Sequence, residues 1–223
     1  MKQEKKNWGS SFLAGFLATV LGIALTFGVQ ELINSGKRAR TARLLAEQIV
    51  EKMDRTYQDL HVYRDIYNSI DTTSMCLRLA IEADTLDRVD ESIVEEFIEN
   101  SLAEYVQADV DNGLDAYRSE ILNTLGNVAL IGHIDQFYSF ARQYAKVSQQ
   151  LIDQKRVVAD LTYAHFYGNT DATWRDYVVF LYTLPEYSLF YSRMQNAFFP
   201  MDVGEKLMLE ELNACKGLLQ QKK

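Results

Sequence analysis

Proline and cysteine are scarce in this sequence. Its 223 residues include two prolines, Pro185 and Pro200, and two cysteines, Cys76 and Cys215. Few prolines leave long stretches free to form uninterrupted helices, and the helix-favouring residues Leu, Ala, Glu, Gln and Arg recur throughout. The two cysteines exclude a disulfide-rich scaffold; they form either one long-range disulfide or two buried thiols. We therefore predict an all-α fold.

Motifs of the common catalytic and cofactor sites are also absent. The sequence contains no GxGxxG, GxxxxGK[ST], GxSxG or HExxH. Its three histidines, His61, His133 and His165, lack companions at metal-ligand spacing. The stretch DVDNG resembles the start of an EF-hand loop, but Gly113 falls at position 5 instead of position 6. We therefore predict no enzymatic activity, no catalytic residue, no metal and no cofactor.

The N-terminal part of the chain carries a net positive charge, and the rest of the chain carries a net negative charge. The net charge is −8, yet residues 1–43 hold seven Lys or Arg against two acids, so the remaining residues carry −13. An acidic domain repels a phosphate backbone, whereas basic residues near an apolar segment suit an anionic lipid surface. The charge pattern argues against a nucleic-acid partner and for a membrane lipid partner.

The longest uncharged run lies near the N-terminus, from Asn7 to Gln30, and includes residues 11–30. Within it, 18 apolar or small residues, 12–29, would cover roughly 27 Å as a helix, close to the hydrocarbon thickness of about 30 Å. A cleaved signal peptide has a shorter apolar region and a better cleavage site than Thr26 and Gly28 offer. A buried core helix is the third interpretation, but the basic flanks and Trp8 at one edge are typical of a membrane segment. We predict a transmembrane helix at residues 11–30.

Small side chains recur every four residues along this segment. Such rows let two membrane helices approach closely, although Gly and Ala are also common in membrane helices that do not associate. The predicted association face consists of Ser11, Ala14, Gly15, Ala18, Thr19, Gly22 and Thr26. The predicted contacts with lipid headgroups are Lys5, Lys6, Trp8, Lys37, Arg38 and Arg40.

Helical periodicity continues beyond the basic cluster. After a polar break, or a soft point in a continuing helix, at residues 34–36, apolar or small residues alternate at spacings of four and three. The side chains at these positions form one packing seam, which packs either within the domain or against a second copy of the chain. A second seam, at 130–151, predicts another long helix. Shorter helices are expected at 73–86, after Asp90 and at 114–125. A last helix is expected to begin with a capping box formed by Asp202 and Glu205. The first seam comprises Ala42, Ala46, Ile49, Met53, Thr56, Leu60, Tyr63, Tyr67 and Ile70.

Aromatic residues concentrate in one segment. Residues 163–199 hold 12 of the chain's 26 aromatic residues and are expected to form two or three short helices and loops. Aromatic residues with a polar tip suit a ligand pocket, a partner surface or the lipid headgroup layer, and the alternative is the packed end of a helical core. The candidate ligand or partner surface consists of Tyr163, Phe166, Tyr167, Trp174, Tyr177, Tyr187 and Tyr191.

The order of anchor, long amphipathic helix and the stretch AYRSEILNTLGNVALIGHIDQFYSF, residues 116–140, resembles an uncharacterised family of bacterial single-pass membrane proteins with an all-helical domain. The resemblance implies a bacterial inner-membrane protein without an assigned activity, and it supplies no functional residues. A short tail with three lysines is hard to translocate, whereas a long domain crosses largely regardless of charge. We therefore expect the large domain outside the cytoplasm.

Four segments follow from these patterns: a basic tail at 1–10, the transmembrane helix at 11–30, a basic juxtamembrane linker at 31–43 and an acidic helical domain, a bundle of long amphipathic helices, at 44–223. The predicted function is non-enzymatic: a membrane-anchored protein that associates with itself, as a homo-oligomer, or with a protein partner. The alternative is a membrane-anchored sensory domain that binds a ligand in an aromatic-rich pocket.

Overall fold

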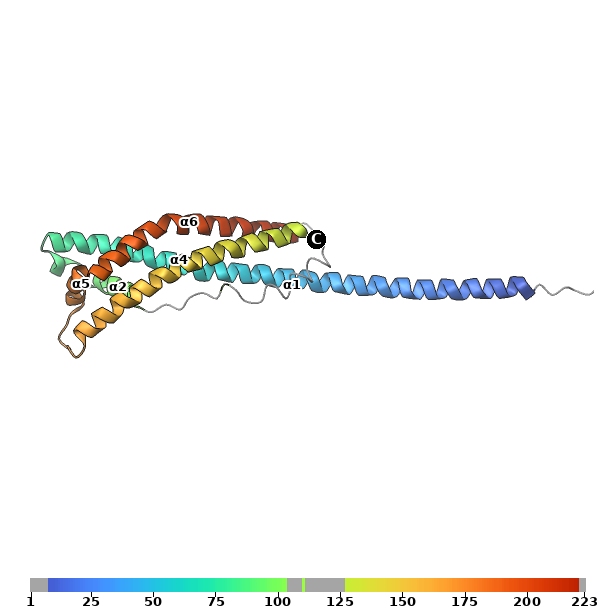
Figure 1. Ribbon diagram of the computed structural model, residues 1–223, viewed down its shortest axis with the longest axis horizontal. Helices are drawn as coiled ribbons and strands as arrows, with labels where there is room; N and C mark the ends of the chain where they lie inside the picture. Colours follow the sequence, from blue (N-terminus) through green and yellow to red (C-terminus); the bar gives the residue numbers. More distant parts are fainter. Residues whose placement is uncertain (1–7, 104–109, 111–126, 221–223) are drawn as a thin grey trace, which may run out of the picture.

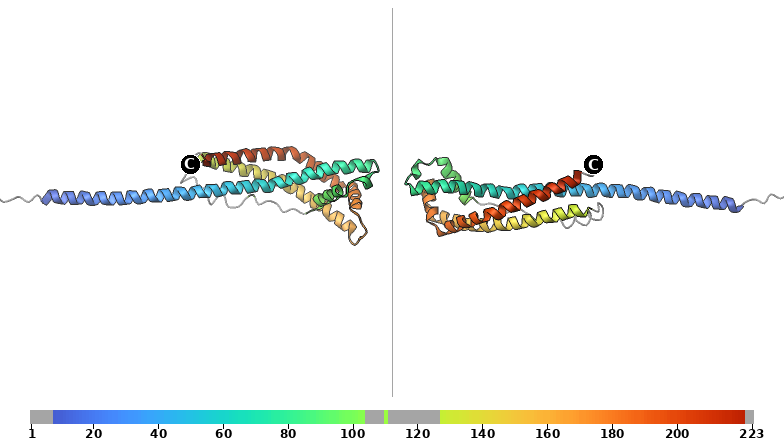
Figure 2. Two further views of the ribbon diagram at one scale, coloured as in Figure 1. Left: turned by 180° about the vertical axis from the view of Figure 1, so that it is seen from behind. Right: turned by 90° about the horizontal axis from the view of Figure 1, so that it is seen from above.

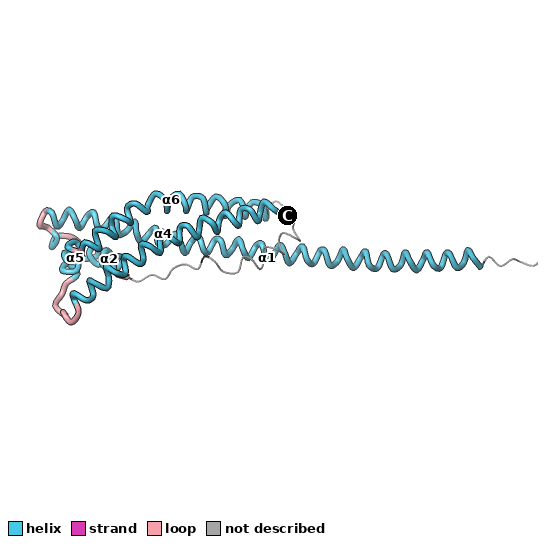
Figure 3. The backbone as a smooth tube through the Cα atoms, in the orientation of Figure 1, coloured by secondary structure: helices cyan, strands magenta, loops and turns pink. Residues whose placement is uncertain are grey.

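The computed structural model describes residues 8–103, 110 and 127–220, with side chains from residue 35 onward. All regular elements in this described part are helices, which confirms the all-α prediction (Figure 3). The helix predicted at 114–125 lies outside the described residues. The elements are α1 (Trp8–Glu82), the 3₁₀ helix η1 (Leu86–Arg88), α2 (Glu91–Leu102), α4 (Val128–Phe166), α5 (Trp174–Thr183) and α6 (Pro185–Gln220).

Three long helices, α1, α4 and α6, form an elongated bundle (Figure 1). Helix α4 runs in the same direction as α1, and α6 returns antiparallel to both, packing mainly against α4. The short helices α2 and α5 lie at one end of the bundle, where they contact each other. From the opposite end, the N-terminal part of α1 extends alone, and the views in Figure 2 agree on this shape.

Helix α1 is continuous over 75 residues. It passes without interruption through the expected polar break at residues 34–36, where no atom from outside the adjoining helix backbone lies within 4 Å of the position that a Cβ on Gly36 would take. It also absorbs the helix expected at 73–86, because the hydroxyls of Thr72 and Thr73 donate to the carbonyls of Asn68 and Ser69 one turn earlier instead of capping a new helix.

The seam predicted between Ala42 and Ile70 is the core face of α1. All nine of its residues are buried within one chain, and none of them has more than 7% of its surface exposed. The structure therefore resolves the two alternatives: this seam packs inside the bundle, against α4 and α6, and is not available to a second copy.

The seam predicted on α4 is buried as well, from Leu130 to Leu151. It continues beyond the predicted end through Lys155, Val158 and Thr162 at the same spacings of three and four. A charged residue therefore occupies a core position, and Lys155 is only 3% exposed.

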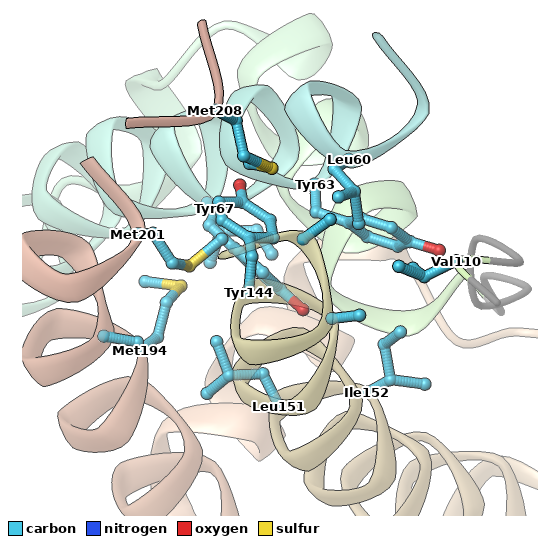
Figure 4. Packing of buried hydrophobic residues seen from close by; sticks show 14 of the residues in the cluster. Leu60, Tyr63, Tyr67, Val110, Tyr144, Leu151, Ile152, Met194, Met201 and Met208 are labelled. Atoms are coloured by element: carbon cyan, nitrogen blue, oxygen red, sulfur yellow. The ribbon is translucent and has the colours of Figure 1, made fainter. Parts of the chain in front are cut away.

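The prediction of a new helix at Asp202 is wrong, because α6 begins at Pro185 and runs through Pro200 to Gln220. Pro200 lacks a backbone N–H to donate, yet the core face of α6 continues on both sides of it. Asp202 and Glu205 bond to other helices instead of forming a capping box. The buried residues of α6 include a row seven positions apart, part of which is drawn in Figure 4: Tyr187, Met194, Met201, Met208 and Cys215.

Candidate functional site

The predicted aromatic surface separates into two groups in the structure. Tyr163 and Phe166 end α4 and meet Trp174 and Tyr177 of α5, with the rings of Phe166 and Tyr177 stacked at 4.0 Å between centroids. Tyr167 follows α4 and is 91% exposed. Tyr187 and Tyr191 belong to α6 and bond to α1. The group between α4 and α5 lines a pocket.

The start of α5 is fixed by a complete capping box. The Thr173 backbone N–H donates to Oδ2 of Asp176 over 2.7 Å, and the Asp176 backbone N–H donates to the Thr173 hydroxyl over 3.4 Å. Hydrogen bonds from Thr173 lower the pKa of Asp176. Gly168, at φ +77°, supplies the left-handed residue that turns the chain after α4. The cap therefore holds Trp174, the first residue of α5, in a defined direction.

An arginine ties α5 to the segment before α2. Nε of Arg175 donates to the Leu86 carbonyl at 3.3 Å, and its Nη2 donates to the Val89 carbonyl at 3.1 Å. Helix α2 is held to α1 in turn, because the Asn100 amide donates to the Ser69 hydroxyl at 3.0 Å. These bonds fix the ends of α2 and α5 relative to the bundle.

A pocket of about 490 Å³ lies between α2, α4 and α5. Its volume is in the range of small-molecule sites. Three of the predicted aromatic residues line it, together with the last turn of α2. Its lining residues are Ile98, Glu99, Asn100, Leu102, Ala103, Tyr163, Trp174 and Tyr177.

The second aromatic group has a structural role. The Tyr182 hydroxyl donates to the Ser74 carbonyl at 2.7 Å, and the Tyr187 hydroxyl lies 3.2 Å from the Ser74 hydroxyl. The Tyr191 hydroxyl donates to Oδ1 of Asp71 over 2.7 Å. Burial raises the pKa of Tyr187 well above its ordinary value. Burial and the nearby Asp71 raise the pKa of Tyr191 to about 12. Both side chains therefore remain neutral hydrogen-bonding groups that join α6 to α1.

A polar cluster at the middle of the bundle was not predicted from the sequence. Oε1 of Glu205 accepts from the Tyr144 hydroxyl at 3.0 Å and lies 3.2 Å from Nδ1 of His61. Next to it, Nε of Arg64 donates to Asp202 at 2.7 Å, and its guanidinium lies 4.1 Å from the centroid of the Phe198 ring. Burial and the Glu205 charge raise the pKa of Tyr144.

Histidine chemistry has little support in the described residues. His133 bonds to Glu211 in the same way that His61 bonds to Glu205, and His165 stacks on Phe180 at 3.9 Å. No group of three or more His, Cys, Asp or Glu side chains in this part of the chain could hold a metal ion. The histidine–glutamate pairs instead join α6 to α1 and α4.

The second hollow, of about 650 Å³, runs between α4 and α6 near Pro200. Its lining includes polar side chains and charged side chains of both signs, Asp153 and Arg193. None of the predicted site residues borders it. It offers no concentration of one chemical type of group.

The predicted membrane residues lie at the other end of the molecule. Lys5 and Lys6 are outside the described residues, and for Trp8 and the small-residue face only the helical backbone is described. Lys37, Arg38 and Arg40 are exposed on α1. Over the residues that the structure describes, no helix combines the length and apolar character that a membrane crossing requires.

Both cysteines are free thiols, but only one of them is buried, so the structure matches neither the predicted disulfide nor the predicted pair of buried thiols. Cys76 is exposed on α1, whereas Cys215 is buried in the α6 core face. Burial and the nearby Glu211 charge raise the pKa of Cys215 to about 12. The long-range disulfide is therefore absent from the structure.

Comparison of the chain with protein-family models, with curated proteins and with solved structures finds no match. The resemblance to a family of bacterial single-pass membrane proteins stays a prediction.

Proposed function

We propose that the chain is a membrane-anchored helical protein that associates through its membrane segment and presents its bundle to a partner. One observation carries the proposal: α1 is a single helix that begins at Trp8, extends beyond the bundle and then provides the bundle's core face. No other described helix runs beside its N-terminal part (Figure 1). The uncharged segment 11–30 lies in that part, and a bilayer would cover it.

The side chains near the start of the bundle support this arrangement. Residues 35–41 are exposed, and burial begins at Ala42. A helix from residue 30 to Ala42 rises about 18 Å, so the bundle would stand directly at the membrane surface. Lys37, Arg38 and Arg40 would then lie at the level of anionic headgroups.

Association is assigned to the membrane segment because the seam of α1 is occupied inside its own bundle. The small-residue face, which includes Gly15 and Gly22, is the remaining surface suited to close helix contact. We place the protein in a bacterial inner membrane with the bundle outside the cytoplasm. We assign no reaction to it.

Crosslinking of the full chain in membranes tests this proposal. We expect dimers that Gly15→Leu and Gly22→Leu reduce severalfold, since leucine would separate the helix backbones. Gly28→Leu is the matched control, because Gly28 lies about 130° around the helix from the centre of that face. A chain that alkaline carbonate extracts from membranes would contradict the anchor, and dimers unaffected by all three substitutions would contradict the association face.

A second candidate function is ligand binding in the pocket between α2, α4 and α5. The pocket's volume of about 490 Å³ and its three aromatic side chains favour it. A membrane-anchored receptor domain would then report its ligand through association. Thermal melting of the purified full chain against a ligand panel tests this function, and no shift with any ligand class would oppose it.

A further inference from the structure

The side chains that line the pocket between α2, α4 and α5 indicate the chemical class of its ligand. We infer that it binds a small organic cation of the quaternary or alkylated ammonium class. This inference rests on the second candidate function, ligand binding in that pocket. It does not depend on whether residues 11–30 cross a membrane.

Aromatic rings supply the first part of the argument. Tyr163, Trp174 and Tyr177 come from two helices and line the same pocket. The rings of Trp174 and Tyr177 are inclined by 54° with centroids 5.7 Å apart, so they form two walls and not a flat stack. The ring of Phe166 stacks on one face of the Tyr177 ring, with centroids 4.0 Å apart. The faces of such rings attract alkylammonium groups, which they contact without the water that a smaller ion would keep.

Charge supplies the second part. Among the described residues that line the pocket, Glu99 is the one charged side chain, and it is exposed. The pocket therefore has a carboxylate for a cation and no lysine or arginine among the described residues of its wall. Arg175, the arginine of α5, donates hydrogen bonds to the carbonyls of Leu86 and Val89.

Helix ends add a third contribution of the same sign. Glu99, Asn100 and Leu102 belong to the last turn of α2, which contains no basic residue. Tyr163 belongs to the last turns of α4. The C-terminal ends of two helices, each with the negative end of its dipole, thus contribute residues to the pocket, and of these two last turns only that of α4 holds a basic residue, His165. The one N-terminal end, that of α5, carries Asp176 in its capping box.

The position of the pocket favours a free cation over the choline headgroup of a lipid. Asn100 bonds to Ser69 of α1, which lies 39 residues beyond residue 30. A helix of that length rises about 60 Å. If the anchor is as proposed, a headgroup of the same bilayer cannot reach the pocket.

Binding of choline to the full chain in dodecyl maltoside tests the inference. In a Trp8→Phe background, Trp174 is the only tryptophan, so a change in its fluorescence reports this pocket. The neutral isostere 3,3-dimethylbutanol has the same shape without the charge. We expect choline to bind saturably and the isostere to bind about three- to thirtyfold more weakly.

Variants locate the site through the N-methyl resonance of choline, observed by NMR. Glu99→Gln should weaken binding about threefold, whereas Glu95→Gln, an exposed change on the same helix outside the pocket, should not. Trp174→Leu should weaken binding about tenfold. Retained circular dichroism shows that each variant is folded.

Four outcomes would overturn the inference: no saturable binding of choline, equal binding of the neutral isostere, binding that survives Trp174→Leu, or saturation by dihexanoyl phosphatidylcholine alone. The first two leave the anchor and its crosslinking test unaffected. Conversely, a chain extracted by carbonate could still bind choline, so failure of the anchor and failure of this site are distinguishable.

Discussion

The Tyr144 hydroxyl of α4 donates a 3.0 Å hydrogen bond to Oε1 of Glu205 in α6, the same oxygen that lies 3.2 Å from Nδ1 of His61 in α1. One carboxylate oxygen thereby joins all three long helices. The Tyr144 ring packs against the backbone of α6 at this level, since a Cβ on Gly204 would lie 3.4 Å from that ring. Polar contact and close packing thus fix the register of α4 against α6 at one point.

We expect Tyr144→Phe to lower the free energy of unfolding by about 1–3 kcal/mol. The reason is that it removes a hydrogen bond to a charged acceptor that is partly buried. Urea unfolding of the full chain in detergent, followed by circular dichroism, measures the change. Tyr163→Phe, which alters an exposed tyrosine, is the matched control and should stay within about 0.5 kcal/mol. Equal losses in the two variants would contradict a special role for the Glu205 contact.

The stability of the bundle should depend on pH through Lys155. Burial lowers the pKa of this side chain to about 7 in the folded chain, against about 10.4 when unfolded. Between these values the unfolded chain binds more protons, so stability should rise with pH, by at most about 1.4 kcal/mol per pH unit from this group.

Comparison of the wild type with Lys155→Met isolates this contribution between pH 7 and 9.5. The upper limit avoids the tyrosines, whose raised pKa values act in the opposite direction above pH 10. We expect the slope of stability against pH to be smaller in Lys155→Met, while Lys146→Met, an exposed change on the same helix, keeps the wild-type slope. Equal slopes in all three proteins would mean that Lys155 titrates normally.

The two cysteines should differ sharply in reactivity. Exposed Cys76 should react with a maleimide in the folded protein, whereas buried Cys215, whose pKa is raised to about 12, should react only after denaturation. Cys76→Ser and Cys215→Ala assign the labels by mass spectrometry. Rapid labelling of Cys215 at pH 7 would contradict the packing of α6.

The same thiol reports the orientation of the bundle. We expect a membrane-impermeant maleimide to label Cys76 in intact cells, because the bundle is proposed to lie outside the cytoplasm. Cys76→Ser gives the background, and permeabilised cells give the full signal. Labelling that requires permeabilisation would place the bundle in the cytoplasm instead.

Periodicity predicted the core more fully than it predicted the helix boundaries. All nine seam residues from Ala42 to Ile70 are buried, since apolar spacing of three and four needs only one continuous partner surface. The seam of α4 was cut short at Leu151 because Lys155, the next core position, is charged. Helix α6 was divided at Asp202 because Asp202 and Glu205 have the spacing of a capping box, whereas the apolar row of α6 runs through this point to Cys215.

The candidate pocket was only partly predictable. Aromatic density pointed to residues 163–199, and Tyr163, Trp174 and Tyr177 do line the pocket. Tyr187 and Tyr191 were grouped with these residues because they lie near them in the sequence. In the structure they follow the turn before α6 and bond to α1. Glu99 comes from a helix about 60 residues earlier in the chain, so only the tertiary fold brings it to the pocket.

The capping box of α5 should be required for both stability and the shape of the pocket. Thr173→Ala removes the side chain that accepts from the Asp176 N–H and donates to its carboxylate, and loss of such a cap costs about 1 kcal/mol. Trp174 follows the cap directly, so its ring should become more mobile. In a Trp8→Phe background, tryptophan fluorescence anisotropy measures that mobility, and urea unfolding measures stability.

Thr170→Ala is the matched control, since Thr170 is exposed in the same turn and lies outside the capping box. Hydrogen bonds from Thr173 lower the pKa of Asp176. The carboxylate's contribution to the cap should therefore be complete above the ordinary Asp pKa of about 3.9 and should be lost as the pH falls below it. At low pH, the stability difference between Thr173→Ala and the wild type should accordingly shrink to the part contributed by the Asp176 N–H bond to the Thr173 hydroxyl. A constant difference between them down to pH 2 would show that the carboxylate contributes nothing to the cap.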